Sequence, residues 1–232
     1  LLESLLLHPH LGGIVDADIA LQKQLRIKKD TLASMSGFDN DVSIRVREQY
    51  ENFPYPRWKH APLFLPEAAD APLRQGSARL LIAGCGTGRE AAGAALSFPQ
   101  AQIDAIDLSA SSLSYALVKA EEQELGNIRF RHGDILHLDF PDGHFDAIFS
   151  HGVLHHMQDP LAGWKSLLRC LKPDGLMRIA LYSETARRHL AAAQRLITEK
   201  KFPATAEGMK DFRRQAATLL PYDTYQSLIG RK

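Results

Sequence analysis

The chain has 232 residues, of which 45% are hydrophobic and 24% charged, a balance typical of a globular protein that buries its own core. Its formal net charge of +1 provides no bulk attraction for nucleic acid or an anionic membrane, so we expect neither as a partner. The two cysteines form no disulfide framework or metal-binding CxxC pattern, and no apolar run is long enough to span a bilayer. We therefore expect a cytoplasmic protein without a bound metal.

The first part of the chain, residues 1–75, is predicted to be helical and then irregular. A helix is expected over 16–35, because Asp16 can cap it and apolar residues recur at roughly helical spacing, at Ile19, Leu21, Leu25 and Leu32. The segment 36–76 is rich in proline and aromatic residues, and prolines at this density favour an extended path over a surface.

Residues 76–183 alternate between apolar strands and amphipathic helices. We expect strands at 79–83, 101–107, 127–133, 145–150 and 175–182. Helices are expected at 89–98, at 109–126 with Ser109 as its cap, and after Asp159, where an apolar stripe recurs at Leu161, Trp164, Leu168 and Leu171. This alternation predicts an α/β fold with a Rossmann-like, doubly wound, mostly parallel sheet covered on both faces. Residues 184–232 are expected to form a helical addition, since no strand candidate follows Tyr182.

The segment GCGTG, at 84–88, lies where the first predicted strand meets a helix. Gly84, Gly86 and Gly88 allow a tight turn whose backbone lies close to a ligand, with helical N–H groups next to it. A glycine-rich turn without a ligand is the alternative. The spacing does not match the dinucleotide fingerprint G-x-G-x-x-G, because Arg89 takes the third glycine's place, and no G-K-[ST] phosphate loop is present. The turn therefore disfavours a nicotinamide cofactor or a nucleoside triphosphate.

Two acidic residues follow neighbouring predicted strands. Asp107 ends the second strand, where a carboxylate can accept hydrogen bonds from both hydroxyls of a ribose. Asp134 follows the third strand and can accept from an exocyclic amine, while Ile135 can pack on a purine face. The alternative for Asp107 is a helix cap at the strand exit, and for Asp134 a plain turn. We favour the ribose for Asp107, because residue type, strand end and distance from the glycine turn agree.

Five segments in order resemble the class I S-adenosylmethionine-dependent methyltransferases: LLIAGCGTGRE, IDAIDLS, RHGDI, FDAIFSHGVLHHM and LKPDGLMRIALYS, over about residues 78–183. The segment QYENFPYPRW also resembles a signature of a bacterial subset that is often fused to upstream tetratricopeptide repeats. Family members usually add a sixth and a seventh strand as a closing hairpin. This chain stops before them and starts at Leu1 without a methionine, so we expect a truncated chain with a possible upstream repeat domain.

The resemblance implies S-adenosylmethionine as cofactor, S-adenosylhomocysteine as product and a strand order of 3-2-1-4-5. It implies that the glycine turn and three strand ends bind the cofactor. The implied residues are Gly84, Cys85, Gly86 and Gly88 along its methionine and ribose, Asp107 and Leu108 at the ribose, Asp134 and Ile135 at the adenine, and Ser150, His151 and Gly152 near the reactive methyl.

The segment SHGVLHHM, after the fourth predicted strand, supplies candidate catalytic bases. A base assists methyl transfer if the acceptor is a hydroxyl or a protonated amine. His155 is the preferred base and His151 the second candidate. The alternative is that these histidines, with His156, only shape the loop. A metal site is disfavoured, because the adjacent His155 and His156 cannot easily point at one ion and no partner ligand completes a set.

The segment ENFPYPRW is predicted to fold over the crevice as a lid that contacts cofactor or substrate. Phe53, Tyr55 and Trp58 would provide apolar cover, and Arg57 could hold the methionine carboxylate or an acidic substrate group. A proline-rich strap packed on the sheet edge is the alternative.

We consider three candidate functions for this chain. The first is methyl transfer to an unidentified small molecule or protein. The second is a non-catalytic module that binds cofactor or a partner, and the third, a nucleotide-binding oxidoreductase, is disfavoured by the glycine spacing.

Overall fold

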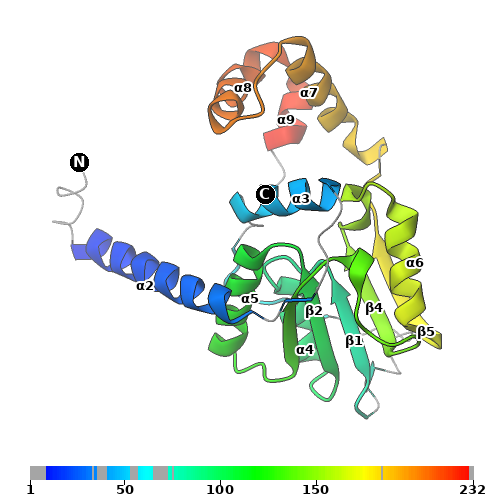
Figure 1. Cartoon of the computed structure of the whole chain (residues 1–232). Helices are drawn as coiled ribbons and strands as arrows, with labels where there is room; N and C mark the ends of the chain where they lie inside the picture. The colour runs from blue at the N-terminus through cyan, green and yellow to red at the C-terminus, as the bar shows by residue number, and fades with distance from the viewer. Residues whose placement is uncertain are drawn as a thin grey trace. The chain divides into compact units, whose positions relative to one another are not determined.

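The computed structural model describes residues 9–32, 34–35, 41–52, 57–64, 73–74, 76–183 and 185–229 (Figure 1). Contacts divide the chain into two compact units, residues 1–181 and 182–232. Among the described residues, no helix has both the length and the apolar character needed to cross a membrane.

The larger unit is built on a sheet of five parallel strands in the order β3-β2-β1-β4-β5 (Figure 1). The strands are β1 (Arg79–Ala83), β2 (Gln102–Asp107), β3 (Ile128–His132), β4 (Phe145–His151) and β5 (Leu171–Ala180). The predicted fold class and strand order are confirmed. The order reverses between β1 and β4, and open α/β sheets bind their ligands at such a switch point, outside the carboxyl ends of the strands.

Helices cover both faces of this sheet because successive strand residues are buried on opposite sides. Leu80 and Ile82 of β1 pack with α4 (Arg89–Ser97) and α5 (Ala110–Glu122) in one apolar cluster. Leu81 and Ala83 pack on the other face with α6 (Pro160–Cys170) and with η3 (Leu154–His156). The short helix η2 (Ile135–His137) follows β3. The predicted caps Ser109 and Asp159 are confirmed, since Ser109 accepts from the Ser112 N–H and Asp159 from two N–H groups of α6. Asp16 is not a cap, because it lies inside α2 (Pro9–Thr31).

The N-terminal part is more helical than predicted. Helix α2 spans Pro9–Thr31 and so begins before Asp16, and α3 spans Asp41–Asn52, where the sequence predicted irregular structure. The segment of α3 contains no proline or glycine, so the helix-breaking composition of the region begins only at Pro54. Both helices pack against α5.

The structure differs from the predictions in the buried face of α6 and in the start of β5. The stripe of α6 is exposed, at 65% for Leu161, 40% for Trp164 and 55% for Leu168, and the buried residues are instead Gly163, Leu167 and Cys170. A Cβ on Gly163 would lie 2.4 Å from Met157 Sδ, so close packing on η3 decides which face of α6 is buried. The assigned strand β5 begins at Leu171 and not at 175. The predicted break at LKPDG is present within it as a register shift, because Phe145 pairs with Leu171 and Ala147 with Leu176. Pro173 is tolerated there because β5 is the outermost of the described strands.

The predicted helix 109–126 is shorter than expected, because α5 ends at Glu122. The smaller unit is helical over its described residues, with η4 (Thr185–Arg187), α7 (Arg188–Glu199), α8 (Ala206–Leu219) and α9 (Tyr222–Ile229). It has an apolar cluster of its own around Ala193, Ala216 and Leu220.

Candidate functional site

The glycine turn joins β1 to α4 with a backbone that favours glycine at three positions. Gly84, Gly86 and Gly88 have φ values of 79°, 53° and 82°. A Cβ on Gly84 would lie 2.3 Å from Val153, and a Cβ on Gly88 would lie 2.5 Å from the Ala116 Cβ. Glycine is therefore required both by conformation and by the close approach of the loop after β4 and of α5.

The Asp107 carboxylate connects this turn to the start of α5. Its Oδ2 accepts from the Gly86 N–H at 2.7 Å, and its Oδ1 accepts from the Ser109 N–H at 2.9 Å. Burial raises the pKa of Asp107, and these N–H groups act in the opposite direction. A carboxylate oxygen has more than one acceptor site, so both oxygens retain capacity for ribose hydroxyls. The contacts thus fit a cap at the strand exit and leave room for the ribose role. The neighbouring carbonyl, of Leu108, contacts His132 Nε2 at 2.9 Å.

Two buried polar atoms lie at the carboxyl ends of β3 and β4. Asp134 is buried beside Ile135, and its Oδ1 accepts from the Leu136 N–H at 2.9 Å. Its Oδ2, and the Oγ of the fully buried Ser150, have no hydrogen-bond partner among the described residues. Because buried polar atoms are almost always paired, these two are candidates for contact with a ligand.

The loop after β4 brings histidines to the same edge of the sheet. His151 Nδ1 lies 2.5 Å from Glu90 Oε1 on α4. Gly152 has a φ of 77°, and its N–H donates to the Ala180 carbonyl. Both ring nitrogens of His155 are buried, whereas His156 Nε2 lies 3.5 Å from the Tyr50 hydroxyl of α3. The catalytic roles of His151 and His155 stay predictions.

Of the predicted lid residues, Phe53 and Tyr55 lie outside the described residues. Arg57 forms an ion pair with Asp18 of α2 at 3.2 Å. Trp58 is buried, and its Nε1–H donates to the Thr87 carbonyl of the glycine turn at 2.8 Å. It packs with Ala92 of α4 and Tyr115 of α5, so it contacts the turn from the helical side. The lid and substrate roles of all four residues stay predictions.

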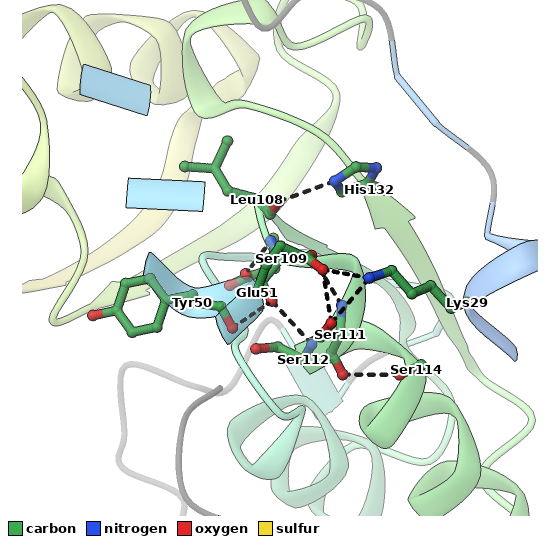
Figure 2. A network of polar contacts seen from close by, with 10 residues as sticks. Lys29, Tyr50, Glu51, Leu108, Ser109, Ser111, Ser112, Ser114 and His132 are labelled. Atoms are coloured by element: carbon green, nitrogen blue, oxygen red, sulfur yellow. Dashed lines mark hydrogen bonds and ion pairs between the residues drawn. The ribbon is translucent and has the colours of Figure 1, made fainter. Parts of the chain in front are cut away.

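A polar network fastens α2 and α3 to the start of α5 (Figure 2). Ser109 of this network also donates its N–H to Asp107. Glu51 accepts from the Ser111 N–H at 3.1 Å and from its hydroxyl at 2.7 Å, and it also pairs with Lys29. The Ser109 hydroxyl donates to the Tyr50 carbonyl at 3.2 Å. Sequence reasoning missed Tyr50, Glu51 and also Glu90. Glu90 lies in the first turn of a helix, where acidic residues are common because they complement the helix dipole. Its position in the sequence therefore did not indicate a contact with His151.

The pKa of Glu51 makes this network sensitive to acid. Partial burial favours the protonated form, but hydrogen bonds from Lys29 and Ser111 outweigh it and lower the pKa of Glu51 to about 2 from 4.5. A lowered pKa in the folded state stabilises the protein above pH 4.5, and this contribution declines as the pH falls toward 2. Allowing for solvent screening, we expect Glu51→Gln to lower the free energy of unfolding by about 1–2 kcal/mol at pH 7.

Urea denaturation of the wild type and Glu51→Gln between pH 3 and pH 7 measures this effect. The difference between the two proteins should shrink as the pH falls below 4.5. Glu122→Gln is the control, because Glu122 is half exposed and pairs with Lys119 of its own helix. A difference for Glu51→Gln that does not change with pH would contradict the assignment.

Comparisons with known proteins agree with this geometry. Residues 81–179 match the family model described as a methyltransferase domain. The chain is 29% identical over 194 residues to an uncharacterized protein of Synechococcus, covering 75% of this chain and 46% of that protein. It is 35% identical over 121 residues to a trans-aconitate 2-methyltransferase of Deinococcus radiodurans, and the match covers 52% of this chain and 43% of that protein. A solved methyltransferase from Aquifex aeolicus is similar at a TM-score of 0.44, with 22% identity over 62% of this chain and 72% of that one.

The chain spans less than half the length of these two curated relatives. The matched segment nevertheless runs from β1 to β5 and contains the glycine turn, Asp107, Asp134 and Ser150. Residues 81–179 are therefore similar to a methyltransferase domain, and this similarity supports S-adenosylmethionine as the cofactor.

Proposed function

We propose that the chain transfers a methyl group from S-adenosylmethionine to a small-molecule or protein acceptor by direct displacement. The observation that carries the proposal is the pair of buried polar atoms without a partner among the described residues, Asp134 Oδ2 and Ser150 Oγ. Asp134 follows β3, and Ser150 lies near the carboxyl end of β4. These two strands flank β2, which ends at Asp107, and β1, which leads into the glycine turn. The match of residues 81–179 to a methyltransferase domain supports the same function.

In this proposal the protein acts mainly by binding and alignment. Asp107 binds the ribose hydroxyls, Asp134 and Ile135 bind the adenine, and the glycine turn approaches the methionine part. Ser150, His151 and Gly152 lie beside the methyl group. Holding nucleophile, methyl and sulfur in line supplies much of the rate acceleration of a displacement. The residues of this chain therefore need to exclude water and orient the acceptor.

The setting of the reaction is part of the proposal. Cys85 and Cys170 are both buried free thiols, which fits the reducing cytoplasm. On the resemblance of QYENFPYPRW we also propose a bacterial protein in which a tetratricopeptide repeat domain precedes this chain, and no nucleic-acid or membrane partner.

Isothermal titration with S-adenosylmethionine and S-adenosylhomocysteine tests the proposal. We expect both to bind, and we expect transfer of labelled methyl from S-adenosylmethionine to a component of a cell extract. Failure of both to bind at millimolar concentration would overturn the proposal. Binding without transfer to any component would favour the alternative, a non-catalytic cofactor-binding or partner-binding module.

A further inference from the structure

Glu90 and His151 face each other across the point where the strand order reverses. Strand β1 leads through the glycine turn into α4, which carries Glu90 in its first turn. Strand β4, the neighbour of β1, ends at His151. Glu90 Oε1 and His151 Nδ1 lie 2.5 Å apart, so this contact joins the two elements that flank the switch point. Open α/β sheets bind their ligands at such a point.

The His151 side chain packs on β4 and is partly exposed. The imidazole stacks on Phe149 with 6.1 Å between ring centroids, and 40% of the His151 side chain is exposed. Arg178 of β5 lies over the ring of Phe149, on which His151 stacks. Among the described residues, Glu90 and Arg178 are the charged groups that act on His151. With Nδ1 directed at Glu90, Nε2 lies on the opposite side of the ring. The contact with Glu90 raises the pKa of His151, while burial and Arg178 act in the opposite direction.

We propose that His151 Nε2 is the base that takes the acceptor's proton, and that Glu90 is the residue that positions it. The inference rests on the proposed methyl transfer. Glu90 Oε1 lies 2.5 Å from Nδ1. A carboxylate at this place favours the tautomer with its hydrogen on Nδ1 and the lone pair on Nε2, and it stabilises the imidazolium as it forms. His155 is less suited to this role, because both of its ring nitrogens are buried.

Atoms and electrons balance in the transfer. An oxygen or nitrogen of the acceptor, still carrying a hydrogen, forms the new bond to the methyl carbon. The electron pair of the broken carbon–sulfur bond stays on sulfur, and the hydrogen leaves as a proton to Nε2. This role predicts the class of acceptor: a hydroxyl group or an amine that bears a hydrogen, rather than a thioether or a tertiary amine.

The first test measures the dyad without turnover. Nuclear magnetic resonance of the histidine rings gives the pKa of His151 in the cofactor-free protein, for the wild type and for Glu90→Gln. We expect Glu90→Gln to lower the pKa of His151, because the contact that raises it is weakened when the carboxylate becomes a neutral amide. His144, whose pKa is lowered by burial and Arg79, is an internal control that should not move. An unchanged titration of His151 would overturn the pairing.

The second test separates the base from cofactor binding. We expect Glu90→Gln to bind S-adenosylhomocysteine within about threefold of the wild type, and we measure kcat of His151→Asn at saturating S-adenosylmethionine so that a change in cofactor affinity does not enter it. Against the acceptor identified in the extract, we expect His151→Asn to lower kcat by about 100-fold or more. We expect Glu90→Gln to lower kcat less and to shift the pH at which the rate rises, whereas Glu122→Gln should change neither. Wild-type kcat in His151→Asn would overturn the base, and lost S-adenosylhomocysteine binding in Glu90→Gln would reassign Glu90 to the cofactor.

These outcomes are distinguishable from failure of the proposed function. If the wild type binds no cofactor or transfers no methyl, the methyl-transfer proposal fails whatever the ring titration shows. If the wild type is active and His151→Asn is equally active, only the dyad fails.

Discussion

Replacing Asp107 with alanine is expected to abolish measurable binding of S-adenosylmethionine and S-adenosylhomocysteine. The carboxylate would lose its bonds to the ribose, and the Gly86 and Ser109 N–H groups would lose their acceptor. A hydrogen bond to a charged group contributes about 1.5–3 kcal/mol, so the loss of two corresponds to at least about 100-fold in Kd. Isothermal titration measures the affinity directly.

Two further variants make this result specific. Asp107→Asn keeps the shape and one acceptor oxygen, so it should bind more weakly than the wild type but better than Asp107→Ala. Asp104→Asn is the matched control, because Asp104 lies on the same strand but pairs with Arg131 at 3.1 Å. It should bind as the wild type does. Wild-type affinity in a folded Asp107→Ala protein would refute the ribose assignment.

Gly84→Ala is expected to destabilise the fold by about 2–4 kcal/mol and to weaken cofactor binding with it. The new Cβ would require a left-handed backbone at a φ of 79° and would lie 2.3 Å from Val153. Backbone strain and overpacking at this one residue therefore both lower the free energy of unfolding. Chemical denaturation measures the loss, and the added variant Val153→Ala should restore part of it through a favourable coupling between the two sites.

Gly126→Ala is the control for Gly84→Ala, because it shows what replacing a glycine by alanine costs where the new Cβ meets no neighbour. A Cβ added at Gly126 would meet no heavy atom of the described residues within 4 Å, and Gly126 has no positive φ. Gly126→Ala should change the free energy of unfolding by no more than about 1 kcal/mol, because the substitution mainly reduces the freedom of the unfolded chain. A Gly84→Ala protein as stable as Gly126→Ala would contradict the turn geometry described for the site.

Much of the sheet could be predicted because its signals are local. The buried strand 79–83, the glycines after it and the caps Ser109 and Asp159 each depend on residues close in sequence. The buried face of α6 could not be predicted, because it depends on contacts with residues outside the helix. Leu161, Trp164 and Leu168 have the correct spacing for a buried face, but Gly163 permits the close contact with Met157 that turns another face inward. Periodicity indicates that a helix has an apolar face, whereas packing decides which face is buried.

The same division holds for the site. The turn at 84–88, Asp107 and Asp134 could be predicted as candidate site residues from the sequence, because a tight strand-to-helix turn and an acidic strand end are defined by neighbouring residues. Only the tertiary structure brought Glu51 to Ser111 and Glu90 to His151, since those partners come from separate elements. It also left Asp134 Oδ2 and Ser150 Oγ buried without a partner among the described residues. Such contacts depend on how helices cross a sheet, and no short sequence pattern encodes that crossing.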